Sequence, residues 1–195
     1  MDILKLFKEK GALLDGHFRL SSGLHSPAYL QCALVLMYPD IAAELGTLLA
    51  QHLQMRAGKP DCVISPAMGG IIIGHEVARA FGVPFLFAER EQENFTLRRG
   101  FHVERDARYA VVEDIITTGG SSQEVVALVD RRGAFPTAVA CIVDRSGGGA
   151  SVLFQGRPLT LLSLAQLSIP AYEAASCPLC REGSLPTKPG SRPQR

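Results

Sequence analysis

Residues 109–122 constrain the fold more than any other stretch, because they combine an apolar run, two acids, a small-residue loop and a helix start. Residues 109–112 form a short apolar run of the kind that a parallel strand covered on both faces requires. Glu113 and Asp114 follow where we expect that strand to end, and a helix is predicted over about 122–132. Ligands of open α/β sheets gather at such strand ends, so this stretch is predicted to hold a binding site.

The loop between the acids and the helix has the composition of a phosphate site. It offers hydroxyl groups and unhindered backbone N–H groups from Thr117, Thr118, Gly119, Gly120 and Ser121. A helix N-terminus carries roughly half a positive charge, which favours a phosphate there. The adjacent carboxylates repel a phosphate ligand unless that ligand also brings hydroxyls or a metal ion, and a ribose 5-phosphate meets both conditions. The alternative is an ordinary strand, an Asp turn and a capped helix.

Two better-known nucleotide motifs are absent from this stretch. A Walker A loop needs Gly-Lys followed by Ser or Thr, and a dinucleotide-binding fold needs Gly-x-Gly-x-x-Gly. The pattern therefore favours a ribose 5-phosphate over either of these nucleotide sites.

Composition sets broad limits on the fold and the partners. A chain of 195 residues with 47% hydrophobic residues suits a single globular domain with its own core. The net charge of +1 gives no sign of a nucleic-acid partner. The five lysines are Lys5, Lys8, Lys10, Lys59 and Lys188. Positive charge offered to a ligand by residues 60–187 must therefore come from arginine, which suits bidentate contact with phosphate or carboxylate.

The five cysteines indicate a reducing compartment. Their number is odd, and Cys32, Cys62 and Cys141 lie within apolar runs, which is unlike a disulfide scaffold. We therefore expect a cytoplasmic protein. With no N-terminal apolar signal and no stretch of about 18 apolar residues, neither secretion nor a membrane span is expected.

Cys177 and Cys180 form a single Cys-x-x-Cys pair. Such a pair supplies two ligands, whereas a structural zinc site needs four. We therefore expect these two cysteines to serve packing. The alternative is a zinc site completed by Cys32, Cys62, Cys141, a histidine or a partner subunit.

The patterns along the chain predict an α/β fold in which a mostly parallel central sheet is flanked by helices. Two alternating segments around a Ser-Gly turn predict a β-hairpin over 16–31, an addition that often forms a hood over a site. The predicted core elements are helices at 39–56 and 71–81 and strands at 61–65, 84–88 and 136–144. Short apolar runs at 152–154 and 159–164 suggest an edge strand and a closing segment.

A second loop, at 66–70, also joins a predicted strand to a helix and contains Gly69. Its backbone N–H groups suit a pyrophosphate oxygen, although glycines in such units often serve packing alone. Arg145 follows the strand predicted at 136–144 and so lies at a strand's carboxyl end.

Residues 89–105 show no clear period and carry Arg90, Arg98, Arg99 and several acids. An irregular segment of this length between two strands is typically functional or mobile. Arg90, just after a strand, is expected to be more fixed than Arg98 and Arg99. The alternative for Arg98 and Arg99 is a pair of solvated charges facing Glu91 and Glu93.

Three separated pieces of the chain resemble one enzyme family. They are F-x-L-x-S-G-x-x-S-x-x-Y at 18–29, the strand and loop at 111–122, and I-V-D-R-S-G at 142–147. The second piece resembles the signature with which type I phosphoribosyltransferases bind 5-phosphoribosyl 1-pyrophosphate (PRPP). The other two resemble the orotate branch of that family, and C-P-L-C-x-x-G at 177–183 resembles one bacterial subgroup of it.

The resemblance implies the type I phosphoribosyltransferase fold and the transfer of a phosphoribosyl group from PRPP to orotate. It implies a single domain over 1–195, with a core at about 36–149 and a hood from 1–35 and about 150–195. It also implies a homodimer and Mg²⁺, held mainly by PRPP rather than by a certain set of protein ligands.

The resemblance also implies roles for matched residues. Glu113 and Asp114 would hold the ribose hydroxyls, with Asp114 a possible proton acceptor, and residues 117–121 would bind the 5-phosphate. Tyr29 would pack on the orotate ring, Thr117 would also meet orotate, and Arg145 would face the orotate carboxylate. Pyrophosphate would be met by Gly69, Arg90, Arg98 and Arg99, with Arg98 and Arg99 as catalytic residues on a closing loop.

The chain departs from the family at three places. The family commonly has lysine at the positions of Ser21 and Gly69, and many members carry a catalytic lysine in the mobile loop. These absences leave binding by arginine and backbone groups open but remove proton transfer from a loop lysine. The alternatives are therefore a phosphoribosyltransferase for another base and a non-catalytic regulator that senses PRPP.

Overall fold

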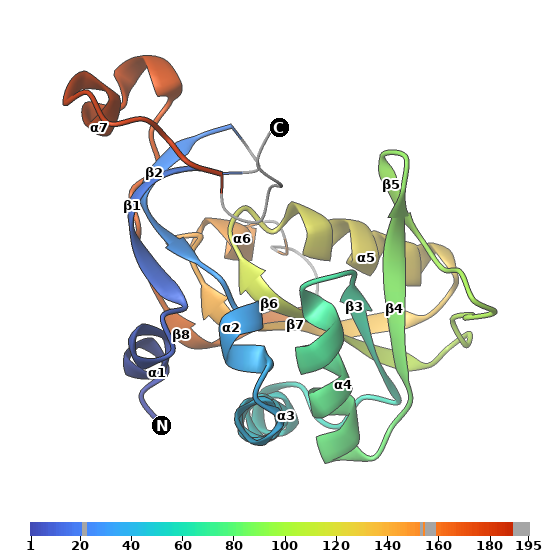
Figure 1. The fold of residues 1–195 in the computed structure, drawn as a ribbon. Helices are drawn as coiled ribbons and strands as arrows, with labels where there is room; N and C mark the ends of the chain where they lie inside the picture. The colour runs from blue at the N-terminus through green and yellow to red at the C-terminus, as the bar shows by residue number, and fades with distance from the viewer. Residues whose placement is uncertain (21–22, 153, 155–158, 189–195) are drawn as a thin grey trace. The chain divides into compact units, whose positions relative to one another are not determined.

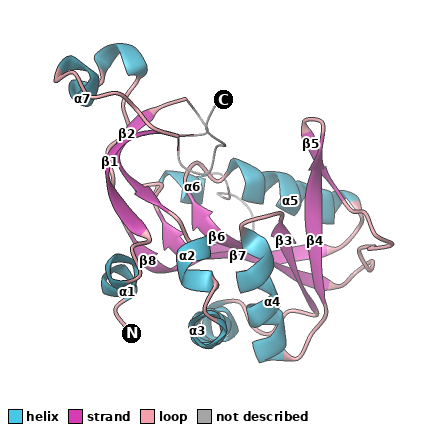
Figure 2. Ribbon diagram, viewed as in Figure 1, coloured by secondary structure: helices cyan, strands magenta, loops and turns pink. Residues whose placement is uncertain are grey.

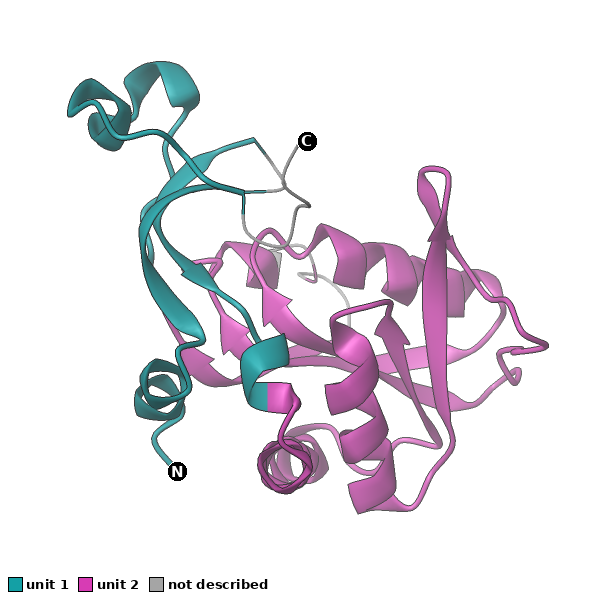
Figure 3. Cartoon of the chain, viewed as in Figure 1, with its two compact units in different colours: residues 1–35, 168–195 teal, residues 36–167 magenta. Residues whose placement is uncertain are grey.

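The computed structural model describes residues 1–20, 23–152, 154 and 159–188. It divides the chain into two compact units, one of residues 1–35 and 168–195 and one of residues 36–167 (Figure 3). Ser21, one of the departures from the family, lies outside the described residues. No helix in the described part of the chain is both long and apolar enough to cross a bilayer.

The larger unit contains a six-stranded sheet in the order β5-β4-β3-β6-β7-β8 (Figures 1 and 2). The parallel strands are β3 (Cys62–Pro66), β4 (Phe85–Glu91), β6 (Arg108–Ile116), β7 (Phe135–Asp144) and β8 (Thr160–Gln166). The short strand β5 (Asn94–Thr96) runs antiparallel to β4. The predicted α/β class with a mostly parallel sheet is confirmed.

Helices cover both faces of this sheet (Figure 1). They are α3 (Pro39–Arg56), α4 (Gly70–Phe81), α5 (Gly120–Arg131) and the short α6 (Gly149–Val152). Pro39 suits the first turn of α3, and the buried Leu45, Leu49 and Leu53 repeat every four residues, so one stripe of that helix faces the sheet. Alternate residues of β6, Tyr109 and Val111, pack instead in the apolar cluster under α5.

The direction of the chain through the sheet reverses at β3. From β3 the chain passes through α4 to β4 on one side, whereas β6 pairs with β3 on the other side. In open α/β sheets, ligands bind outside the carboxyl ends of the strands at such a switch point. The carboxyl ends of β3 and β6 are therefore where this fold places a site.

The smaller unit is built on the antiparallel hairpin of β1 (Leu13–Arg19) and β2 (His25–Leu30), which confirms the predicted hairpin. It also contains α1 (Ile3–Glu9), α2 (Ala33–Leu36), which ends one residue beyond the unit, the 3₁₀ turn η1 (Ala174–Ser176) and α7 (Pro178–Arg181). The predicted hood resumed at about residue 150, but residues 160–166 form β8 of the large sheet because they pair with β7 along 138–144.

The packing of α4 on β3 depends on glycine. A Cβ atom added at Gly74 would overlap Ser65 Oγ and lie 2.6 Å from the Phe85 ring. We expect Gly74→Ala to lower the free energy of unfolding by about 1–3 kcal/mol, because overpacking outweighs the helix propensity that alanine gains. Gly149→Ala is the matched control, since a Cβ there meets nothing within 4 Å. Urea unfolding measures both variants, and equal stability of the two would contradict this account.

Candidate functional site

The acidic pair lies inside β6 and not after its end, which corrects the predicted strand over 109–112. Backbone pairing with β7 continues to Ile116, which is opposite Asp144, so the ladder extends past both acids. Glu113 contacts the start of α5, whereas Asp114 contacts the loop after β3. The two carboxyl groups therefore reach both loops that border the switch point.

Glu113 is half-buried and accepts a hydrogen bond of 3.1 Å from the hydroxyl of Ser122. Burial raises the pKa of its carboxyl group to about 8, and the neighbouring Asp114 raises it further than burial alone would. The hydrogen bond from Ser122 acts in the opposite direction and lowers the pKa. Glu113 therefore keeps its proton at neutral pH until a hydrogen-bond donor or a cation reaches it.

Asp114 is also half-buried, and burial raises its pKa as well. The backbone N–H of Ile115 donates to Asp114 Oδ1 over 2.9 Å and partly offsets that effect. A Cβ atom at Gly69 would lie 2.7 Å from the same oxygen. The loop after β3 can therefore approach Asp114 only because residue 69 has no side chain, and a lysine there would displace the carboxyl group.

The loop after β6 leads directly into α5, which begins at Gly120, two residues earlier than predicted. Thr117 and Thr118 are exposed, and Gly120 and Ser121 are half-buried. Gly119 precedes the helix with φ of 81°, a left-handed conformation that glycine adopts without steric cost. The N–H groups in the first turn of a helix have no partner within it, so this end of α5 has the geometry that anions prefer.

Arg145 lies beside this loop through its backbone. Its N–H donates to the carbonyl of Ile116 over 2.8 Å, so the residue after β7 is bonded to the last residue of β6. The buried Asp144 supports the turn by accepting a 2.8 Å hydrogen bond from the N–H of Ser146. The structure thus brings Arg145 next to Thr117, as the sequence predicts for two residues at neighbouring strand ends.

The segment at 89–105 is more regular than predicted. Strand β4 continues to Glu91, and β5 folds back on it, because Glu89 pairs with Thr96 and Glu91 with Asn94. The guanidinium group of Arg90 donates two hydrogen bonds of 3.1 and 3.2 Å to Glu124 of α5 and lies 4.2 Å from the centre of the Phe95 ring. These contacts hold Arg90 against α5, as expected of the more fixed arginine.

Arg98 and Arg99 follow β5 and are exposed. Arg99 makes two 2.9 Å hydrogen bonds to Glu89 of β4, not to the Glu91 or Glu93 of the alternative interpretation. This pairing raises the pKa of Arg99 and lowers that of Glu89, in each case chiefly through the hydrogen bonds between them. In this structure Arg99 is therefore held on β4.

Comparisons with known proteins agree with this geometry. Residues 35–154 match the family of the phosphoribosyl transferase domain. Orotate phosphoribosyltransferase from Carboxydothermus hydrogenoformans is 50% identical over 98% of this chain and 98% of that protein, and the enzyme from Nitratiruptor sp. is 47% identical over 98% and 99%.

The chain belongs to the orotate phosphoribosyltransferase family. A solved orotate phosphoribosyltransferase from Aeropyrum pernix is similar to it with a TM-score of 0.73 and 25% identity, covering 85% of this chain and 93% of that one. The family and fold predicted from the motifs are therefore confirmed. The role of each residue stays a prediction.

Tyr29, predicted to pack on orotate, lies on β2 of the smaller unit, with its ring 5.8 Å from that of Phe18. Three contacts at the site were missed from the sequence of this orotate phosphoribosyltransferase family member. Ser122 bonds Glu113, Glu124 holds Arg90, and Glu89 holds Arg99. Only Ser122 carried a usable signal, since it lies in the loop-to-helix motif itself.

The raised pKa of Glu113 makes the stability of the free protein depend on pH. Between its ordinary pKa of 4.5 and about 8, the unfolded chain has lost this proton while the folded chain keeps it. The free energy of unfolding therefore falls as pH rises through that window, by at most about 1.4 kcal/mol per pH unit from this group. Glu113→Gln is expected to flatten the slope measured by urea unfolding between pH 5 and pH 8.

Glu44→Gln, which removes an exposed carboxyl group on α3, is the control and should keep the slope of the parent protein. The raised pKa of Asp114 leaves a residual slope in Glu113→Gln. An unchanged slope in Glu113→Gln would show that Glu113 is ionised in the folded protein across this range.

Proposed function

We propose that this chain transfers the 5-phosphoribosyl group from PRPP to a ring nitrogen of orotate, giving orotidine 5′-monophosphate and pyrophosphate. The observation that carries the proposal is the acidic pair of β6, which runs directly into the anion-binding start of α5 at the switch point of the sheet. A ligand that fits both parts has adjacent hydroxyls and a phosphate, as PRPP has. The names of the similar proteins support orotate as the acceptor.

In this proposal the two parts of the site bind two parts of PRPP. The N–H groups at the start of α5 and the hydroxyls of Thr117, Thr118 and Ser121 bind the 5-phosphate. The carboxylates of Glu113 and Asp114 accept hydrogen bonds from the ribose hydroxyls. Because both pKa values are raised in the free protein, accepting those bonds requires that protons leave the carboxyl groups when PRPP binds.

Catalysis in this proposal is mainly electrostatic. Positive charge develops on the ribose as pyrophosphate leaves, and the ionised Asp114 and Glu113 next to the ribose stabilise it. The departing pyrophosphate gains negative charge, which the arginines and the loop containing Gly69 offset. A single well-placed hydrogen-bond donor of this kind contributes about 2.7–4 kcal/mol to a transition state.

We also propose Mg²⁺ as the cofactor, held mainly by PRPP. The donor set of the site fits this ion, because Mg²⁺ prefers oxygen ligands and is usually bound through one or two carboxylates together with substrate phosphates. Asp114 and Glu113 are the carboxylates that would hold it. When bound, the ion neutralises charge on the leaving pyrophosphate.

Arginine takes the place of the missing loop lysine in this proposal. Arg99 is paired with Glu89 on the protein surface, and exposed ion pairs add little to stability. Exchange of Glu89 for pyrophosphate therefore needs little free energy, so Arg99, together with Arg98, suits a segment that closes over the substrate. The five free cysteines fit a reducing compartment such as the cytoplasm.

Orotate is an anion, and Arg145 is the cation at the end of β7 that we assign to it. Arg145→Ala is expected to raise the KM for orotate by tenfold or more (about 1.4 kcal/mol) while changing the KM for PRPP much less. Arg132→Ala, which removes an exposed arginine after α5, is the control. The assay follows orotate consumption with PRPP and Mg²⁺, alongside a panel of purines. Turnover of a purine instead of orotate would refute the proposed acceptor.

We propose that the working form is a homodimer in which residues 98–99 reach the partner's site. Support comes from the family and from exposed apolar side chains at Met55, Met68 and Ile72, which are 72%, 82% and 43% exposed in the single chain. Such side chains on the surface of one chain suit contact with a second copy.

Subunit mixing tests the shared site. Asp114→Asn and Arg99→Ala are each expected to be nearly inactive. A random mixture makes half its dimers mixed, and each mixed dimer has one intact site, so about a quarter of normal activity should return. Mass spectrometry of differently labelled subunits verifies the exchange. Exchange without recovery would mean that Arg99 acts within its own chain.

A further inference from the structure

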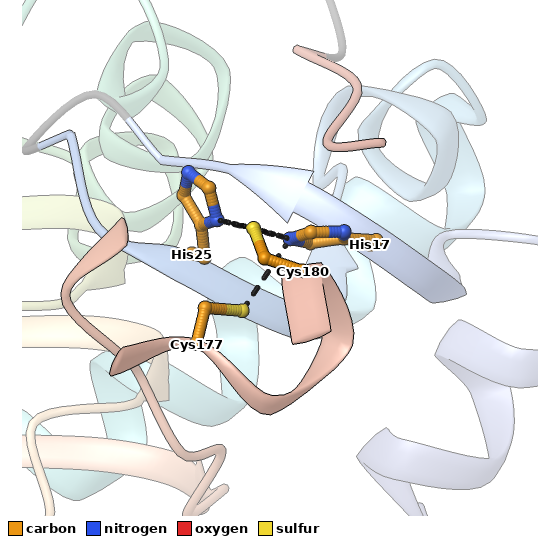
Figure 4. Close-up of side chains that lie close together, drawn as sticks. All are labelled: His17, His25, Cys177 and Cys180. Atoms are coloured by element: carbon orange, nitrogen blue, oxygen red, sulfur yellow. Dashed lines mark hydrogen bonds between the residues drawn. The ribbon is translucent and has the colours of Figure 1, made fainter. Parts of the chain in front are cut away.

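Four metal-binding side chains meet in the smaller unit (Figure 4). They are His17 of β1, His25 of β2, Cys177 at the cap of α7 and Cys180 within α7. Their four ligand atoms all lie within 4.8 Å of one another. Within the described ranges, this is the one such group of three or more histidine, cysteine or acidic side chains. The cluster lies in a different compact unit from the acidic pair and has no part in the proposed transfer.

The distances within the cluster match the edges of a metal-centred tetrahedron. His17 Nε2 lies 3.0 Å from His25 Nδ1 and 3.5 Å from Cys177 Sγ. Cys180 Sγ lies 3.3 Å from His25 Nδ1 and 3.8 Å from His17 Nε2. Zinc bonds of about 2.0–2.1 Å to nitrogen and 2.3 Å to sulfur require edges of about 3.3–3.8 Å in a regular tetrahedron.

We propose that this cluster binds one zinc ion as a structural site. Two thiolates and two imidazoles are a donor set that favours zinc among the divalent metals of the cell. All four positions are filled by protein, which is typical of structural sites, since catalytic zinc keeps a position for water or substrate. The two thiolates balance the charge of the ion, and both imidazoles bind in the neutral form.

The surroundings of His17 orient it as a metal ligand. Its Nδ1 lies 3.0 Å from the backbone carbonyl oxygen of Ser184 and 3.2 Å from the hydroxyl of the same residue. A carbonyl oxygen can only accept, so Nδ1 carries the proton and Nε2 presents its lone pair to the cluster. A carbonyl partner on the second ring nitrogen is a common feature of zinc-bound histidines.

Burial gives the cluster a dry environment. His17 and His25 are each 6% exposed, and Cys177 is fully buried. Buried imidazoles and thiols need partners, and a shared ion satisfies all four groups at once. Gly183, with φ of 84°, turns the chain after α7, and the N–H of Ser184 bonds the carbonyl of Leu179. This turn brings the Ser184 carbonyl to His17.

The proposed ion would fasten the C-terminal segment to the hairpin. Backbone hydrogen bonds join Tyr172 to His25 and Thr187 to His17, so the Cys-x-x-Cys pair lies between two points of attachment. The ion closes this arrangement across 160 residues of sequence, from His17 to Cys177. Metal binding of this kind contributes to folding because the unfolded chain does not hold the four ligands together.

This inference replaces the packing role expected for Cys177 and Cys180. Of the alternatives weighed from the sequence, completion by histidine is the one that the structure favours, although it takes two histidines. A disulfide between Cys177 and Cys180 is the competing chemistry, and both thiols are free in the structure.

Metal content of the full chain tests the proposal. We expect one zinc per chain by plasma mass spectrometry after growth with added zinc and gel filtration. Cobalt(II) in place of zinc should give the visible absorption bands of a tetrahedral thiolate site. Cys180→Ser, at the most exposed of the four ligands, should lose most of the metal. Cys62→Ala, which removes a buried thiol from the larger unit, should keep one zinc.

Thermal unfolding supplies a second measurement that does not depend on activity. A zinc-selective chelator should lower the Tm of the parent protein, and zinc but not magnesium should restore it. The chelator should not change the Tm of Cys180→Ser. Zinc-free parent protein without cobalt bands, a Cys177–Cys180 disulfide, or full zinc content in Cys180→Ser would each overturn the proposal.

Discussion

The close approach of the loop after β3 to β6 is the contact on which the site depends. A Cβ atom at Gly69 would lie 2.7 Å from the Asp114 carboxyl group, and one at Gly70 would lie 2.9 Å from the carbonyl of Val112. Both separations are shorter than side chains tolerate, so two glycines let one loop lie against the neighbouring strand. This contact joins the two strand-loop-helix units of the switch point into a single site. It also explains why a lysine is absent at position 69, since its side chain would have to displace Asp114.

Electrostatics follows from the same contact. Bringing the loop against β6 removes water from Asp114 and Glu113, and burial raises both pKa values. The free protein therefore holds two carboxyl groups in an environment that disfavours their charge. Ribose hydroxyls and a cation provide the hydrogen bonds and the opposite charge that the ionised forms need. The arginines outside the pair are held by acids of their own, as Arg90 is by Glu124 and Arg99 by Glu89.

The sequence was informative where one local pattern determines one structure. The apolar run before Glu113, the loop of threonines and glycines, and the four-residue repeat of leucines in α3 each predicted their element, because burial and helix geometry act over short distances. Three features depend on residues far apart and could not be predicted. Strand β6 extends past the acids because β7 continues to pair with it, and β5 exists only by pairing with β4. His17 and His25 reach the Cys-x-x-Cys pair only through backbone bonds between the hairpin and the C-terminal segment.

The central claim is that the acids of β6 bind the ribose of PRPP and lose protons in doing so. Calorimetric titration of the protein with PRPP and Mg²⁺ near pH 7, repeated in buffers of different ionisation enthalpy, counts those protons directly. Burial raises the pKa of Glu113 to about 8, so the free protein holds this proton and should release it on binding. The account predicts that the parent protein releases more protons than Glu113→Gln, by up to about one per chain. Equal proton release by the two proteins, with PRPP bound to both, would contradict the account.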